Sequence, residues 1–138
     1  MIFTDVTPNL VVSDLDRSLA FYRDALGFKV VTTEPDPPPA AQPGAGGSGL
    51  AFAWMQRDTV SVFLNSEASA QMKTAAGTNS LFVTLQAETV ASGVDALFES
   101  VKGRAPVAMD LVDQFYGMRE FAIKDPDGYL VIFAQPIR

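Results

Sequence analysis

The strongest constraint on the fold is a pattern that occurs twice within the 138 residues of the chain. Each half begins with an apolar segment, continues with apolar residues at helical spacing and ends with three further segments of strand-like composition. Thr7 in the first half aligns with Ser80 in the second. We therefore predict two modules of the order strand–helix–strand–strand–strand, residues 1–66 and 79–138, joined by a linker over residues 67–78.

Each predicted helix has an apolar face and a stop signal. This face consists of Leu15, Leu19, Tyr22 and Leu26 in the first module and of Val90, Val94, Leu97, Phe98 and Val101 in the second. Ser13 and Asp14 can cap the first helix, because their side chains accept hydrogen bonds from free backbone N–H groups. Gly27 can end the first helix, because glycine readily adopts the left-handed conformation found there, and Gly103 marks the end of the second.

The predicted strands are rich in β-branched and aromatic residues. They cover Val6–Val12, Phe28–Thr33, Leu50–Gln56 and Thr59–Asn65 in the first module and Ser80–Gln86, Val107–Leu111, Met118–Lys124 and Tyr129–Ala134 in the second. The segment Pro35–Gly49 holds five prolines and four glycines, so we predict a long loop there, either a flap over a binding site or a disordered segment. Met72 in the linker can anchor a short helical turn.

Composition removes several classes of function. The chain has no cysteine and no histidine, which excludes disulfides, cysteine-ligated zinc and catalytic arrangements built on these residues. A net charge of −6 argues against direct nucleic-acid binding and favours cationic ligands. The first residues do not resemble a signal peptide, and no stretch approaches the ~20 apolar residues of a membrane span. We expect a single cytoplasmic domain over residues 1–138 that contacts no membrane.

Two segments carry a resemblance to a known family. They are Val12–Phe28, with the sequence VSDLDRSLAFYRDALGF, and Arg119–Phe133, with the sequence REFAIKDPDGYLVIF. Both resemble the glyoxalase / bleomycin-resistance / extradiol-dioxygenase superfamily, which has the vicinal oxygen chelate fold. The resemblance implies an α+β domain in which two βαβββ modules form a cup-shaped mixed sheet with helices on its outer face. It also implies a homodimer, in which the first strand can be exchanged between subunits.

Metalloenzymes of this family bind a metal through His and Glu residues in the cup. At those positions this chain carries Thr7, Ser80 and Ile132. Isoleucine has no coordinating atom, and neutral hydroxyl groups are poor ligands for a divalent transition ion. We therefore expect no transition metal, no cofactor and no catalysis, and the resemblance is to the bleomycin-resistance branch, which lacks a metal.

Side chains alternate along a strand, and this alternation predicts which residues line the cup. We place Phe52 and Trp54 there, because the Ala and Met residues that alternate with them fit better under a helix. Alignment of the two modules adds Val62. The full set of predicted ligand-binding residues is Phe52, Trp54, Val62, Phe82, Phe115, Tyr116, Met118, Leu130 and Ile132.

An apolar and aromatic cup suits planar aromatic ligands. We expect the protein to sequester an aromatic antibiotic or secondary metabolite, which can also be cationic, and so to give self-resistance. A bleomycin-like glycopeptide and an intercalating peptide antibiotic fit equally well. One alternative is a divergent metal-dependent lyase, isomerase or dioxygenase-like enzyme that uses Glu120, Asp110 and Asp113 as a base or as oxygen ligands. Another is an accessory or chaperone protein in secondary-metabolite biosynthesis.

Overall fold

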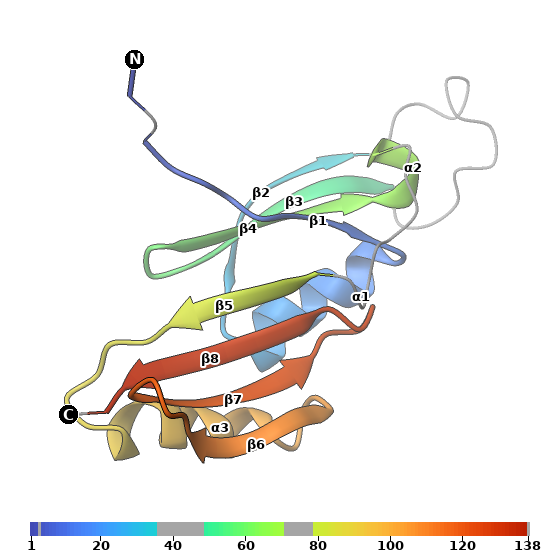
Figure 1. Ribbon diagram of the computed structural model, residues 1–138. Helices are drawn as coiled ribbons and strands as arrows, with labels where there is room; N and C mark the ends of the chain where they lie inside the picture. Colours follow the sequence, from blue (N-terminus) through green and yellow to red (C-terminus); the bar gives the residue numbers. More distant parts are fainter. Residues whose placement is uncertain (3, 36–48, 71–78, 138) are drawn as a thin grey trace. The chain divides into compact units, whose positions relative to one another are not determined.

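The chain contains two compact units, each built around one four-stranded sheet. The computed structural model describes residues 1–2, 4–35, 49–70 and 79–137, and the units comprise Met1–Ala75 and Ala76–Arg138. Figure 1 shows the strands of both sheets. The predicted loop Pro35–Gly49 lies outside the described residues apart from its two end residues, and the predicted turn at Met72 lies outside them as well.

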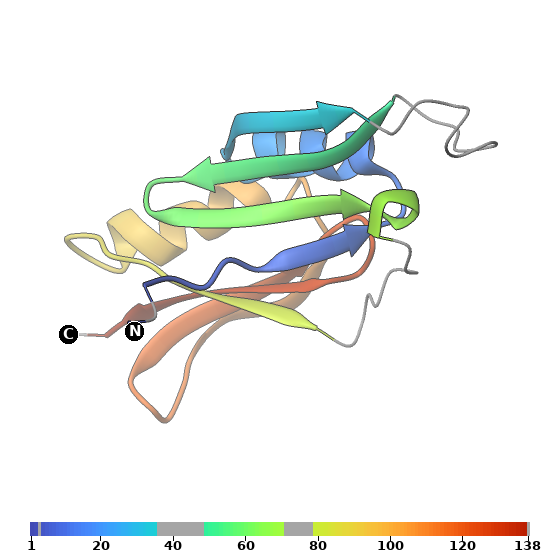
Figure 2. The same ribbon diagram turned by 90° about the horizontal axis from the view of Figure 1, so that it is seen from above.

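The first unit contains a sheet in the strand order β1-β4-β3-β2, in which β1 runs parallel to β4 and the other pairs are antiparallel. Its elements are β1 (Asn9–Val12), α1 (Leu15–Ala20), the π-helical turn η1 (Phe21–Ala25), β2 (Lys29–Pro35), β3 (Leu50–Arg57), β4 (Val60–Ser66) and the short α2 (Glu67–Ala70). The Asp14 side chain caps α1 by accepting a bond of 3.1 Å from the Arg17 backbone N–H. Figure 2 shows α1 against one face of this sheet.

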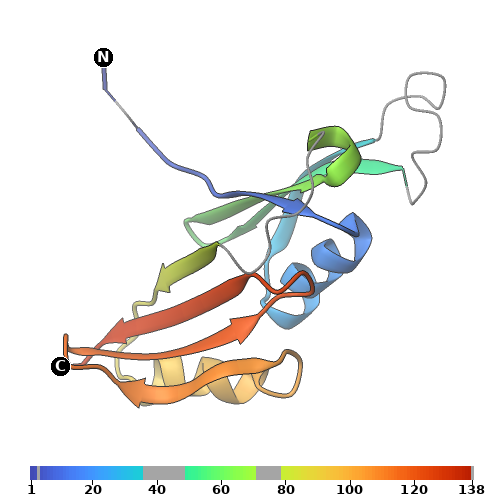
Figure 3. The same cartoon turned by 45° about the vertical axis from the view of Figure 1, so that its right-hand side comes forward.

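The second unit repeats the arrangement in the strand order β5-β8-β7-β6, with β5 parallel to β8. Its elements are β5 (Ser80–Thr84), the π-helical turn η2 (Ala91–Asp95), α3 (Ala96–Val101), β6 (Val107–Asp113), β7 (Met118–Lys124) and β8 (Leu130–Pro136). Figure 3 shows α3 along one face of β6 and β7. Across the described parts of the chain, no helix is long and apolar enough to span a membrane.

The matching strand orders confirm the predicted repeat of strand, helix and three strands, and with it the α+β class. The first strand begins at Asn9, later than predicted. Pro8 has no backbone N–H to donate to a ladder, and Val6 is exposed and has no packing partner to hold it in a strand. The helix α2 was not predicted.

Each sheet has one face buried under its own helix. In the first sheet Ala51, Ala53 and Met55 are buried on this helix face, with Met55 fully covered. In the second sheet Phe121 is fully buried, and its ring lies 5.1 Å from that of Phe98 on α3. We call the opposite side of each sheet its open face.

Candidate functional site

Three aromatic side chains lie together on the open face of the first sheet. Phe52 and Trp54 alternate along β3 with the buried Ala and Met residues, so they leave the sheet on the side away from α1. Phe63 on β4 lies opposite Trp54. The Phe63 ring centroid is 5.2 Å from that of Phe52 and 6.0 Å from that of Trp54, in edge-to-face geometry. All three side chains are partly exposed, so they present a continuous aromatic surface.

Polar side chains surround this aromatic cluster. The Trp54 indole Nε1 donates a hydrogen bond of 3.0 Å to Ser61 Oγ, and Asn65 Nδ2 donates to Asn9 Oδ1. Because the indole N–H already has a partner, the Trp54 ring is fixed in place without a ligand. The face therefore offers flat, oriented rings with amides and a hydroxyl at their edge.

The placement of Val62 on the ligand-facing side was wrong. Val62 is 1% exposed and lies opposite Met55 on the helix face, together with Leu64. A shift of one residue in strand register moves every side chain to the other side of a sheet. The residue that occupies the open face is Phe63, which sequence reasoning missed although Ser61, Phe63 and Asn65 alternate with the aliphatic residues.

The open face of the second sheet has an apolar floor. Phe82 on β5 lies opposite Ile132 on β8 and is 53% exposed. Leu130 lies opposite Ser80 on the same side, and Met118 lies opposite Pro136. Four of the predicted residues, Phe82, Met118, Leu130 and Ile132, are therefore brought together on one face of this unit.

Two further predicted residues lie on the turn between β6 and β7. Phe115 is 98% exposed, Tyr116 is 50% exposed, and their rings meet edge to face at 5.1 Å. Gly117 N–H donates to the Gln114 carbonyl at 3.0 Å and closes the turn. Gly117 has a φ of +81°, a conformation that favours glycine.

A buried carboxylate, Glu120, stands on the same open face of β7 as Met118 and Ala122, which lie two residues before and after it. Its side chain is 4% exposed. Oε1 accepts hydrogen bonds from the Tyr116 hydroxyl at 2.5 Å and from Gln114 Nε2 at 2.9 Å. The bond to Glu120, together with burial and the carboxylate charge, raises the pKa of the Tyr116 hydroxyl. Glu120 is absent from the predicted set of ligand-binding residues.

The three acidic residues of the enzyme alternative do not converge. Asp113 binds Arg119 at 2.9 Å, and Arg119 also binds Asp95 of η2 at 2.6 Å, on the helix face. These bonds raise the pKa of Arg119, which therefore stays charged. Asp110 is exposed. Within the described residues, no group of three or more Asp or Glu side chains lies close enough to hold a metal ion.

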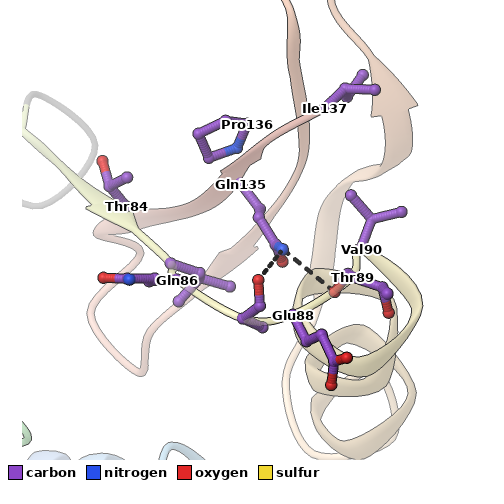
Figure 4. Close-up of a pocket in the computed structure, with 10 residues that line it drawn as sticks. Thr84, Gln86, Glu88, Thr89, Val90, Gln135, Pro136 and Ile137 are labelled. Atoms are coloured by element: carbon purple, nitrogen blue, oxygen red, sulfur yellow. Dashed lines mark hydrogen bonds between the residues drawn. The ribbon is translucent and has the colours of Figure 1, made fainter.

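A hollow of about 420 Å³ lies in the second unit between the segment that leaves β5 and the end of β8. Its lining residues are Thr84, Leu85, Gln86, Ala87, Glu88, Thr89, Val90, Gln135, Pro136 and Ile137. As Figure 4 shows, Gln135 Nε2 donates to the carbonyls of Ala87 and Thr89. None of the predicted ligand-binding residues lines this hollow, and it has no aromatic wall.

The comparison with known families settles the class of protein. The family model of the Glyoxalase/Bleomycin resistance protein/Dioxygenase superfamily matches residues 6–133. The chain therefore belongs to this superfamily, as the two segments around Val12 and Arg119 predict. Among its relatives is the bleomycin resistance protein of Geobacillus stearothermophilus, which is 27% identical in an alignment of 139 positions that covers 95% of this chain and 96% of that protein.

Solved structures show the same fold in proteins with different names. Lactoylglutathione lyase from Agrobacterium tumefaciens has a TM-score of 0.68 at 19% identity, with 96% of this chain and 92% of that chain covered. The bleomycin-binding protein from bleomycin-producing Streptomyces verticillus, complexed with copper(II)-bleomycin, has a TM-score of 0.62 at 21% identity, with 96% of both chains covered. At these identities the likeness establishes the fold alone, and the fold is compatible with both enzymes and binding proteins.

Proposed function

We propose that the protein binds an aromatic antibiotic or related secondary metabolite and sequesters it without changing it. The observation that carries this proposal is the cluster of Phe52, Trp54 and Phe63 on the open face of the first sheet. Partly exposed aromatic rings on a sheet are positioned to stack on a planar ligand, and each such contact contributes roughly 0.5–1.5 kcal/mol beyond area burial.

Two further observations support sequestration over catalysis. The chain has no histidine and no cysteine, and at the positions where the family's metalloenzymes carry ligands it has Thr7, Ser80 and Ile132. The relatives named as bleomycin resistance proteins align over nearly the full length of this chain. Resistance by this route requires one protein binding site for each drug molecule, because the drug is held and not consumed. The homodimer and the joint cup of both modules stay predictions.

Titration of the protein with bleomycin tests the proposal. Trp54 is the only tryptophan, so its fluorescence should change on binding and reach saturation. Trp54→Ala should weaken binding by more than ~1 kcal/mol, as truncation of a central aromatic contact does. Calorimetry measures the affinity of this variant, which has no tryptophan to report binding.

A matched control is Phe28→Ala, which truncates a buried aromatic residue of the same unit. The Phe28 ring packs against Tyr22 at 5.7 Å on the helix side. This variant should lose stability and keep its affinity for bleomycin. If Trp54→Ala loses stability with no loss of affinity, Trp54 is a core residue and the proposed binding face is wrong.

A further inference from the structure

The carboxylate of Glu120 has two oxygens with different surroundings. Oε1 accepts from both the Tyr116 hydroxyl and Gln114 Nε2. Oε2 is buried and, among the described residues, has no hydrogen-bond partner. A buried carboxylate oxygen without a donor is costly, because nothing replaces the water that it has lost. The site therefore has an acceptor that its own protein groups leave unused.

The arginine next to Glu120 on the chain is occupied elsewhere. Arg119 follows Glu120 directly on the chain, but alternation along β7 points its side chain to the helix face. There its guanidinium binds Asp95 at 2.6 Å and Asp113 at 2.9 Å. Arg119 therefore satisfies two other carboxylates and does not neutralise Glu120.

The position of Glu120 differs from that of the other buried acid, Asp125. Asp125 Oδ1 accepts from the backbone N–H groups of Asp127 and Tyr129, both at 2.9 Å, so this carboxylate holds a turn together. Glu120 receives no backbone donor in the described structure and stands on the open face, opposite Ala134 on β8. The side chain of Ala134 is small and carries no hydrogen-bond donor for the carboxylate.

The side chains that hold Oε1 lie on the turn between β6 and β7. Tyr116 is half exposed and Phe115 almost fully exposed, so the outer side of this aromatic pair is not packed against the unit. A donor reaches Oε2 only if a neighbouring side chain moves, and an outward rotation of the half-exposed Tyr116 ring would provide this movement while Gln114 keeps its hold on Oε1. The same two rings can then contact the apolar body of whatever donates to Oε2.

We propose that Glu120 is a cation-recognition residue on the open face of the second sheet. Its Oε2 accepts hydrogen bonds from a protonated amine or amidine carried on an aromatic ligand, and Tyr116 and Phe115 contact the ligand's apolar body. A charged N–H donor matches a buried carboxylate better than a neutral one, since hydrogen bonds between ionised groups are shorter and stronger. The net charge of −6 also concentrates organic cations near the protein. This inference rests on the proposed function and names the ligand class.

Two tricyclic probes of nearly the same shape provide the test. 9-Aminoacridine is cationic at neutral pH and carries N–H donors, whereas acridine is its neutral parent. Calorimetric titration of the wild-type protein should show tighter binding of the cation, by about tenfold or more, as expected for a hydrogen bond to a charged group. In Glu120→Gln this preference should disappear, while the affinity for acridine should stay the same.

Asp110→Asn is the matched control, because it removes one negative charge from the exposed surface of the neighbouring strand β6. It should keep the preference for the cation. Glu120→Asp serves as the second variant if Glu120→Gln does not fold; it keeps the charge but shortens the side chain, and it should reduce the preference.

Equal affinity of the wild-type protein for both probes would overturn the role of Glu120 and leave the proposed aromatic binding standing. Loss of the preference in Asp110→Asn to the same extent as in Glu120→Gln would likewise overturn it, because general charge would then explain the effect. If neither probe binds the wild-type protein but bleomycin does, the role of Glu120 is overturned and the proposed function stands; if bleomycin also fails to bind, both fail.

Discussion

The open faces of the two sheets occupy the same place in the repeat and carry different chemistry. Trp54 lies opposite Phe63 in the first sheet, and Ala122 lies opposite Ile132 on the equivalent strands of the second sheet. Trp54 therefore corresponds to Ala122, and Phe63 corresponds to Ile132. By the same comparison, Phe52 corresponds to Glu120. One face thus carries a cluster of three aromatic rings and no charge, whereas the other has an apolar floor and one buried carboxylate. Duplication of a backbone plan leaves the side chains on each open face free to diverge, as long as the helix faces keep the core.

The largest expected effect is a loss of stability when a residue on the helix face of the first sheet is truncated, compared with truncation of its neighbour on the open face. Leu64 is fully buried on β4, and Leu64→Ala should lower the free energy of unfolding by about 2–5 kcal/mol, because it leaves a cavity in the core. The neighbouring Phe63→Ala should cost less stability and weaken ligand binding more. Urea unfolding and calorimetric titration measure the two quantities. A larger stability loss in Phe63→Ala would reverse the assigned faces of β4.

A smaller effect distinguishes how the two units fix the start of their helices. The first helix is capped locally by Asp14, whereas in the second unit Gln135 on β8 accepts from the Val94 backbone N–H at 2.9 Å. Gln135→Ala should destabilise the protein by about 1–3 kcal/mol, since a buried N–H loses its partner. Thermal unfolding checks this value. A change below a few tenths of a kcal/mol would mean that another group replaces Gln135.

The smallest effect concerns the hydrogen bond between Tyr116 and Glu120. Phe52, which occupies the position of Glu120 in the first sheet, cannot accept such a bond. This bond raises the pKa of Tyr116 above its ordinary value of 10.0. A raised folded-state pKa stabilises the protein below the unfolded-state pKa, and the stabilisation is lost as the pH rises through the folded-state pKa. The difference in unfolding free energy between wild type and Tyr116→Phe should therefore be constant below pH 10.0 and shrink above it. A difference that grows with alkaline pH would contradict the hydrogen bond.

Much of the architecture could be predicted from the sequence because it depends on local patterns. The apolar periodicity of the helices and the turn signals fix the order of elements, and the Ala and Met residues of β3 identify the open side on which Phe52 and Trp54 stand. The error at Val62 arose because alignment of the two modules does not set the register of β4. The alternation of Ser61, Phe63 and Asn65 within that strand was the better signal.

The state of Glu120 depends on contacts that a sequence pattern does not define. Alternation along β7 places Glu120 on the open face, but the hydrogen bonds to Oε1 require the turn that brings Gln114 and Tyr116 back over the strand. That turn depends on the left-handed conformation of Gly117, with a φ of +81°. The burial of Oε2 and its lack of a partner follow from this geometry, so only the structure shows them.

The claim that the protein sequesters its ligand unchanged is tested most directly by the fate of the drug. Bleomycin is incubated for a long period in large molar excess over the protein, the protein is then isolated and denatured, and all fractions are examined by mass spectrometry. We expect the protein to carry a saturable, stoichiometric amount of bleomycin, and we expect the released drug to be intact. A covalently altered product in molar excess over the protein would show turnover and contradict sequestration.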